Sequence, residues 1–108
     1  MNNLIIGTQY NCWKKKRKKR QDIIDKMHVG DRVYFEKTEY NGDPLVLVID
    51  DKTKLDIGVM SPGVSETIIK DYPNSDFEGC LTDRYKQSFH VQYWEVEESH
   101  VNRKDKKR

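Results

Sequence analysis

Two apolar stretches separated by turn-forming residues dominate the hydrophobic pattern of this chain. Residues 33–40 are rich in β-branched and aromatic side chains, and residues 45–49 are apolar without a break. The turn formers at residues 41–44 favour a reversal of the chain, so the pattern predicts a β-hairpin. Because an unbroken apolar strand is typical of burial on both faces, we expect residues 45–49 to form the central strand of a small, closed or nearly closed sheet.

The pattern before this hairpin predicts one strand and one short helix. Three consecutive apolar residues indicate a strand within residues 3–10, in which Gly7 marks a bulge or a close approach of the backbone. Apolar residues recur at helical spacing within residues 18–27, which predicts an amphipathic helix. The basic residues at the start of this segment then form either a flexible lead-in or the first helical turn.

The pattern after the hairpin predicts three strands and a second short helix. We expect strands at residues 55–60, 77–82 and 88–98, of which the last alternates most clearly between apolar and polar positions. Ser61 and Pro62 are residue types favoured at a helix start. The chain is therefore expected to be mainly β, with two short helices.

Composition favours a small barrel over a helical bundle. The chain has 108 residues, of which 35% are hydrophobic and 35% charged, so the core is small and a single domain is expected. We assign the domain to residues 1–98 and expect residues 99–108 to be a disordered basic tail. Apolar runs are too short for a membrane span or a signal peptide, and we expect a cytoplasmic protein without membrane contact, with Cys12 and Cys80 as reduced thiols.

The charge is unevenly distributed although the net charge is only +2. Residues 14–20 are an unbroken basic run, preceded closely by Tyr10 and Trp13. Cations that hold phosphates beside rings that stack on bases are typical of single-stranded nucleic-acid binding. The alternative is that the run is a solvated segment and that the two aromatic residues close one end of the core.

The sequence lacks the common catalytic and cofactor motifs. It has no phosphate-binding glycine loop, no nucleophile elbow, and no Cys or His spacing typical of a metal site. We therefore predict a non-catalytic protein without cofactor or metal. The remaining alternative is a metal-dependent nuclease site formed by Asp43, Asp56 and Asp83.

Three segments in order along the chain resemble the HIRAN domain. They are Ile5-Ile6-Gly7-Thr8-Gln9-Tyr10, the turn at Asp43 followed by an apolar strand and Ile57-Gly58-Val59, and Phe77-Glu78-Gly79 followed by Tyr85 and Phe89-His90-Val91-Gln92-Tyr93-Trp94. The resemblance covers residues 4–98. It implies a small OB/SH3-like β-barrel. Domains of this family occur fused to SWI2/SNF2-type helicases of replication-fork repair and as small stand-alone proteins in bacteria and phages.

The resemblance also implies binding of single-stranded DNA at its free 3′-hydroxyl end. Tyr10 and Tyr85 match positions that stack on bases, and Asp43 matches the aspartate that contacts the terminal sugar hydroxyl. A carboxylate accepts a hydrogen bond from a hydroxyl and repels a phosphate, so this role is physically reasonable, although aspartate is also common in turns for its own sake. The full set of candidate DNA-binding residues is Tyr10, Asp43, Tyr85, Tyr40, Gln9, Trp13, Lys14, Lys15, Lys16 and Arg17.

The chain departs from the family pattern around the implied end-binding pocket. The turn is one residue shorter, and Gly42 stands where a tyrosine is usual, with Tyr40 close by. Gln9 replaces a basic residue, and Val59 and Pro62 stand near positions of a histidine and a lysine. The basic run is a candidate replacement for lost phosphate contacts.

We therefore predict a monomeric domain that binds single-stranded DNA in DNA repair or processing, with a helicase or nuclease as a further candidate partner. This mechanism requires Tyr10, Asp43 and Tyr85 to lie within one or two nucleotides of each other. The alternative from another class is an SH3-like protein-interaction module whose basic segments are incidental.

Overall fold

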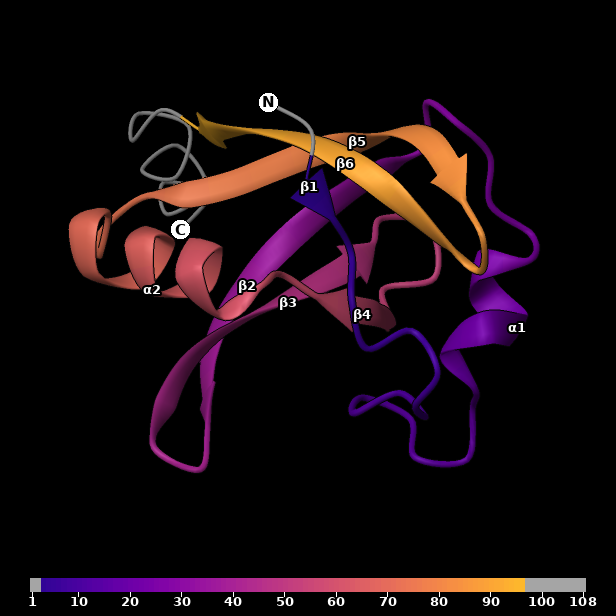
Figure 1. Ribbon diagram of the computed structural model, residues 1–108, viewed down its shortest axis with the longest axis horizontal. Coiled ribbons are helices and arrows are strands. Elements are labelled where there is room, and N and C mark those ends of the chain that lie inside the picture. The colour runs from indigo at the N-terminus through magenta and orange to yellow at the C-terminus, as the bar shows by residue number, and fades with distance from the viewer. Residues whose placement is uncertain (1–2, 97–108) are drawn as a thin grey trace, which may run out of the picture.

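The computed structural model describes residues 3–96, which form one six-stranded antiparallel sheet and two helices (Figure 1). The strands are β1 (Asn3–Leu4), β2 (Arg32–Tyr40), β3 (Asp43–Asp50), β4 (Asp56–Val59), β5 (Asp76–Tyr85) and β6 (Ser88–Val96). The helices are α1 (Arg20–Ile24) and α2 (Pro62–Asp71). The predicted mainly β class with two short helices is confirmed, whereas the predicted disordered tail at residues 99–108 lies outside the described residues.

The sheet is not closed and has two ends, so the predicted small OB/SH3-like β-barrel is not confirmed. Its strand order is β1-β6-β5-β2-β3-β4, which leaves β1 and β4 at the ends. One isolated bridge, between Ile6 and Val59, joins the two ends of the sheet. The N–H group of each residue donates a hydrogen bond to the carbonyl of the other, both at 2.9 Å. The N-terminal segment therefore contacts β6 through β1 and then contacts β4 through Ile6, two residues after β1 ends.

The predicted hairpin is present as β2 and β3, with a tighter turn than expected. The turn consists of Asn41 and Gly42, which both have positive φ angles, 54° and 86°. Two positive φ angles match the right-handed twist of the flanking strands, and this explains why a two-residue connection suffices. Pro44 belongs to β3 and pairs in register with Glu39.

The expectation that residues 45–49 form the central strand was wrong, because β3 lies next to the end strand β4. Its burial was predicted correctly from Val46 onward. Val46 and Val48 belong to the core, while α2 packs on the same strand and the hydroxyl of Ser65 accepts a hydrogen bond from the Val46 N–H at 3.0 Å. A helix that covers β3 explains the unbroken apolar pattern without a central position in the sheet.

The N-terminal elements are shorter than predicted. Strand β1 has two residues, and the chain turns at Gly7, whose φ of 72° favours glycine. Helix α1 begins only at Arg20, because Lys19 pairs with Asn11 in an isolated bridge. The basic residues before α1 therefore belong to a loop and not to the helix.

The elements after the hairpin follow the predicted pattern closely. Ser61 caps α2 by accepting a hydrogen bond from the Val64 N–H at 3.4 Å, and Pro62 occupies the first helical position. In β6, Phe89 and Val91 are buried while the alternating residues His90 and Gln92 are more exposed, as the alternation predicts. Within residues 3–96, neither helix has the length and apolar character needed to cross a membrane.

Candidate nucleic-acid interface

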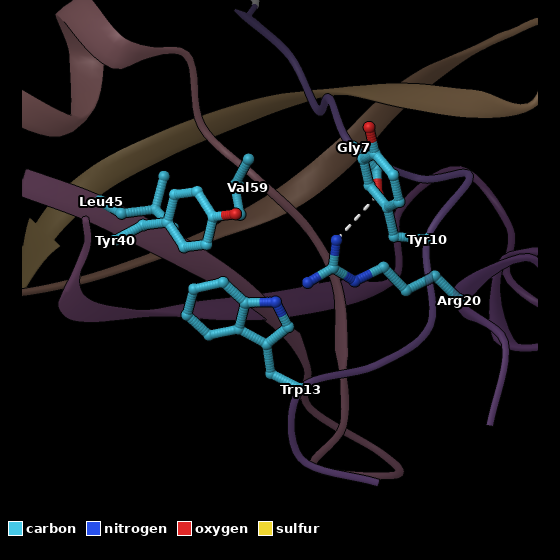
Figure 2. A pocket seen from close by; sticks show the side chains of 7 residues that line it. All are labelled: Gly7, Tyr10, Trp13, Arg20, Tyr40, Leu45 and Val59. Atoms are coloured by element: carbon cyan, nitrogen blue, oxygen red, sulfur yellow. Dashed lines mark hydrogen bonds between the residues drawn. The ribbon is translucent and has the colours of Figure 1, made fainter. Parts of the chain in front are cut away.

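A pocket of about 420 Å³ lies between the loop that precedes α1 and the β2–β3 hairpin (Figure 2). Both segments extend to the lower side of the sheet in Figure 1. The residues that line the pocket are Gly7, Tyr10, Trp13, Arg20, Tyr40, Leu45 and Val59. Its volume is within the range of small-molecule sites, so one planar group of nucleobase size is a reasonable occupant.

Three aromatic side chains give this pocket its character. Tyr10 and Trp13 come from the loop, and Tyr40 comes from the end of β2. The rings of Trp13 and Tyr40 lie 5.8 Å apart between centroids with a tilt of 38°. Tyr10, Trp13 and Tyr40 are 62%, 41% and 57% exposed, so their faces are accessible to a ligand. Three of the predicted DNA-binding residues are thus brought together.

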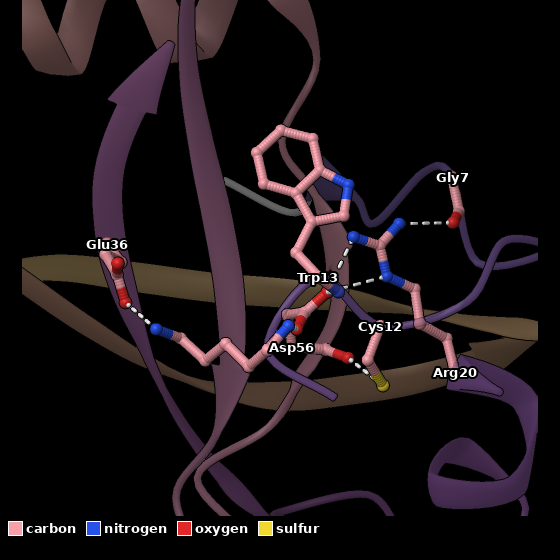
Figure 3. Close-up of polar contacts among 7 residues, drawn as sticks. Gly7, Cys12, Trp13, Arg20, Glu36 and Asp56 are labelled. Carbon is pink, nitrogen blue, oxygen red and sulfur yellow. Dashed lines mark hydrogen bonds and ion pairs between the residues drawn. The ribbon is translucent and has the colours of Figure 1, made fainter. Parts of the chain in front are cut away.

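Arg20 lies at the inner side of the pocket and is buried against Asp56 (Figure 3). Its Nε and Nη2 donate to Oδ2 of Asp56 at 3.0 and 2.7 Å, and its Nη1 donates to the Gly7 carbonyl at 2.8 Å. Arg20 is 2% exposed and Asp56 0%. The expectation that the whole run 14–20 is solvated or bound to phosphate was therefore wrong for its last residue.

The Asp56 carboxylate also fixes the loop that carries Trp13. It accepts hydrogen bonds from the backbone N–H groups of Trp13 and Lys14 at 2.8 and 2.9 Å. Burial by itself raises the pKa of Asp56, but the two backbone donors and Arg20 together outweigh it, so the pKa is lower than the ordinary value. Asp56 is thus a charged anchor for one wall of the pocket.

The basic loop that follows Trp13 is held by hydrogen bonds to its own carbonyl groups, and its cations are exposed to solvent. The Asn11 side chain donates to the Lys16 carbonyl at 3.0 Å, and the Cys12 N–H donates to that of Lys18 at 2.8 Å. Lys15, Lys16 and Arg17 are exposed.

Lys14 differs from the next three cations because it is paired. Its Nζ lies 2.7 Å from Oε1 of Glu36, and this hydrogen bond raises the pKa of Lys14. The accessible positive charge of the loop therefore comes from the residues after Lys14.

Seven predicted site residues do not line the pocket: the four basic residues Lys14, Lys15, Lys16 and Arg17, and three others. Asp43 is exposed at the start of β3, where it pairs in register with Tyr40, so it is next to a pocket residue without lining the pocket. Gln9 and Tyr85 line a second, open depression of about 610 Å³, which also includes Gly7. Tyr10 and Tyr85 thus face two different hollows that have Gly7 in common.

Arg20 was not among the predicted site residues, although the sequence contains a signal for it. Arg20, Ile23 and Ile24 have the spacing of one helical face, which places the arginine on the buried side of α1. Asp56, which was weighed as a metal ligand, is engaged by Arg20 instead. Across residues 3–96, no group of three His, Cys, Asp or Glu side chains is placed to hold a metal ion.

Comparisons with protein-family models, with curated proteins and with solved structures found no significant match to this chain. Its function must therefore be argued from its own residues.

Proposed function

We propose that this protein binds single-stranded DNA through the pocket formed by Tyr10, Trp13 and Tyr40, as a non-catalytic domain of the HIRAN type. The observation that carries the proposal is the convergence of these three accessible rings, two of which belong to the loop that also carries the exposed basic residues. Rings of this kind stack on bases of any sequence, and each stacked base contributes about 1–3 kcal/mol. Lys15, Lys16 and Arg17 then hold the phosphates that follow the stacked base.

The proposal includes recognition of a free 3′ end by Asp43. Its register partner Tyr40 lines the pocket, so a base that stacks on Tyr40 has its sugar close to the start of β3. A carboxylate at this place favours a terminal hydroxyl over a terminal phosphate by accepting a hydrogen bond from the former and repelling the latter. The wider role is DNA repair or processing, with a helicase or nuclease as a partner.

The first test is a comparison of two tryptophan variants of similar exposure. Trp13 lines the pocket at 41% exposure, whereas Trp94 on β6 is 38% exposed and does not line it. We expect Trp13→Ala to weaken binding of a short labelled oligonucleotide about tenfold or more, from the loss of one stacking contact, and Trp94→Ala to leave it unchanged. Fluorescence anisotropy at low salt measures both. Absence of binding by the unaltered protein would refute the proposal.

A second titration tests the end-recognition part alone. Oligonucleotides with a 3′-hydroxyl and a 3′-phosphate are compared with the unaltered protein and with Asp43→Asn. We expect a preference for the hydroxyl that the variant loses. Equal affinities for the two ends would remove end recognition and leave single-strand binding in place.

The second candidate is a protein-interaction module, which is favoured by one observation. Arg20, the charged side chain that lines the aromatic pocket in the described part of the chain, is already neutralised by Asp56. Pockets lined by aromatic rings also bind peptides. A helicase or nuclease captured by the protein, together with no measurable affinity for DNA, would favour this candidate.

A further inference from the structure

Arg20 retains hydrogen-bonding capacity toward the pocket. A guanidinium carries five N–H groups in a rigid planar fork. Within the described residues, three of them have acceptors: one on Nε, one on Nη2 and one on Nη1. One N–H on Nη1 and one on Nη2 remain, and Figure 2 shows this end of the side chain directed into the pocket between Tyr10 and Trp13.

The pocket around this guanidinium suits a neutral group better than a phosphate. The Arg20 charge is balanced by the Asp56 carboxylate at 2.7 Å, so a phosphate would bring its negative charge close to that carboxylate, and no other lining residue carries a positive charge. The rest of the lining is aromatic, aliphatic or glycine. Arg20 is 2% exposed, so its two remaining N–H donors lie at the floor of the pocket, and a planar ligand would reach them only from within it. The pair carries little net charge there.

We propose that Arg20 reads the base held in this pocket and favours guanine over adenine. The O6 and N7 atoms of guanine are adjacent acceptors, and they match the two N–H groups at the end of an arginine fork. Adenine has N7 as an acceptor beside the N6 amino donor, so one of the two N–H groups would meet a donor and lose its partner. The inference rests on the proposed single-strand binding and adds a base preference to it.

Asp56 and Gly7 make this reading possible because they fix the fork. Two hydrogen bonds to Asp56 and one to the Gly7 carbonyl hold the guanidinium in one orientation. A Cβ at Gly7 would lie 3.4 Å from Nη1, an ordinary contact distance, so glycine is favoured beside the fork by its φ of 72°. A donor pair held in place before binding loses little freedom when the base enters.

The test compares short labelled oligothymidines that carry one guanine, adenine, hypoxanthine or 7-deazaguanine, titrated against the unaltered protein. We expect guanine to bind roughly tenfold more tightly than adenine, as is usual for a bidentate arginine contact. Hypoxanthine keeps O6 and N7 and should bind like guanine. In 7-deazaguanine the N7 acceptor is missing, so it should lose most of the preference.

The outcomes separate this inference from the proposed function. Equal binding of guanine and adenine, or of guanine and 7-deazaguanine, would overturn base reading while leaving single-strand binding intact. Binding of none of the oligonucleotides would overturn both.

The base preference of an Arg20→Lys variant tests the role of Arg20 directly. Arg20→Lys keeps a cation for Asp56 but has no fork, so it should bind guanine- and adenine-containing strands alike. Its folding is checked by denaturant unfolding, and the base analogues keep the inference testable if the variant is unstable. An Arg20→Lys protein that is folded and retains the guanine preference would contradict the role of Arg20.

Discussion

The carboxylate of Asp56 connects three parts of the chain. It accepts hydrogen bonds from the backbone of Trp13 and Lys14 and from the side chain of Arg20. Both charged partners of the ion pair are buried, so removal of either leaves the other without a counter-charge. The cost of an unpaired buried charge exceeds the net benefit of the intact pair, which makes this residue sensitive to substitution.

We expect Asp56→Asn to lower the free energy of unfolding by about 3–5 kcal/mol, because it leaves Arg20 buried without its counter-charge. Urea unfolding followed by tryptophan fluorescence measures the change. The control is Asp51→Asn, which removes an exposed ion pair with Lys54 and should change stability by less than about 0.5 kcal/mol. A similar effect of both substitutions would contradict the buried-anchor role.

The loss of folding stability at acid pH should depend on Asp56 as well. Folding lowers the pKa of Asp56, so folded protein binds this proton less tightly than unfolded protein. The resulting stability is fully present above the ordinary value of 3.8 and is lost as the pH falls through the lower value of the folded state. As the pH falls below 3.8, the free energy of unfolding of the unaltered protein should therefore decrease more steeply than that of the Asp56→Asn variant.

At the scale of elements, the N-terminal segment packs against β4 at a glycine. A Cβ on Gly58 would lie 2.4 Å from a side-chain carbon of Ile5 and 2.7 Å from the Ile6 carbonyl oxygen. These distances are too short for any real contact, and one of the two partners is backbone. The close approach of this segment to β4 therefore requires a residue without a side chain.

We expect Gly58→Ala to destabilise the fold by about 1–3 kcal/mol, the usual cost of overpacking, because the N-terminal segment must move away from β4. Gly63→Ala is the matched control, since no atom lies within 4 Å of a Cβ at that position in α2. Alanine there should be neutral or stabilise by up to about 1 kcal/mol. Unfolding midpoints that shift equally in both variants would argue against the tight packing.

Elements with a local signal were predictable from the sequence, and contacts between distant elements were not. The turn at Asn41 and Gly42 and the alternation in β6 are local patterns, and both are present. The Arg20–Asp56 pair joins residues 36 positions apart, and no local pattern specifies such a partner. The pocket contains both kinds of residue. Its three aromatic residues were predicted, whereas its buried Arg20 was expected to contact phosphate or solvent with the rest of the basic run.

At the scale of the whole molecule, the net charge of +2 hides a concentrated basic loop. Lys15, Lys16 and Arg17 are exposed in succession two to four residues after Trp13, which lines the aromatic pocket. A local field of this kind attracts polyanions even when the total charge is small. The salt dependence of DNA binding is therefore the property that reports on the loop.

We expect replacement of Lys15, Lys16 and Arg17 by glutamine to reduce the log–log salt slope of single-strand binding by about 2, from about 0.7 per released phosphate contact. Anisotropy titrations over a series of salt concentrations measure the slope. A protein with glutamine at Lys52, Lys54 and Lys70 has the same net charge and should keep the original slope. Equal slopes in both triple variants would assign the effect to total charge alone.

The single bridge between Ile6 and Val59 has a consequence for solubility. Residues 3–5 pair with β6, and Ile6 pairs with Val59 of β4, so the segment covers part of the free edge of β6 and the N–H and C=O groups of Val59. Detachment of this short N-terminal segment would expose these backbone groups of β6 and β4. Exposed strand edges can pair with strands from other molecules. We therefore expect these first residues of the described chain to lower the tendency of the sheet to associate edge to edge with other molecules.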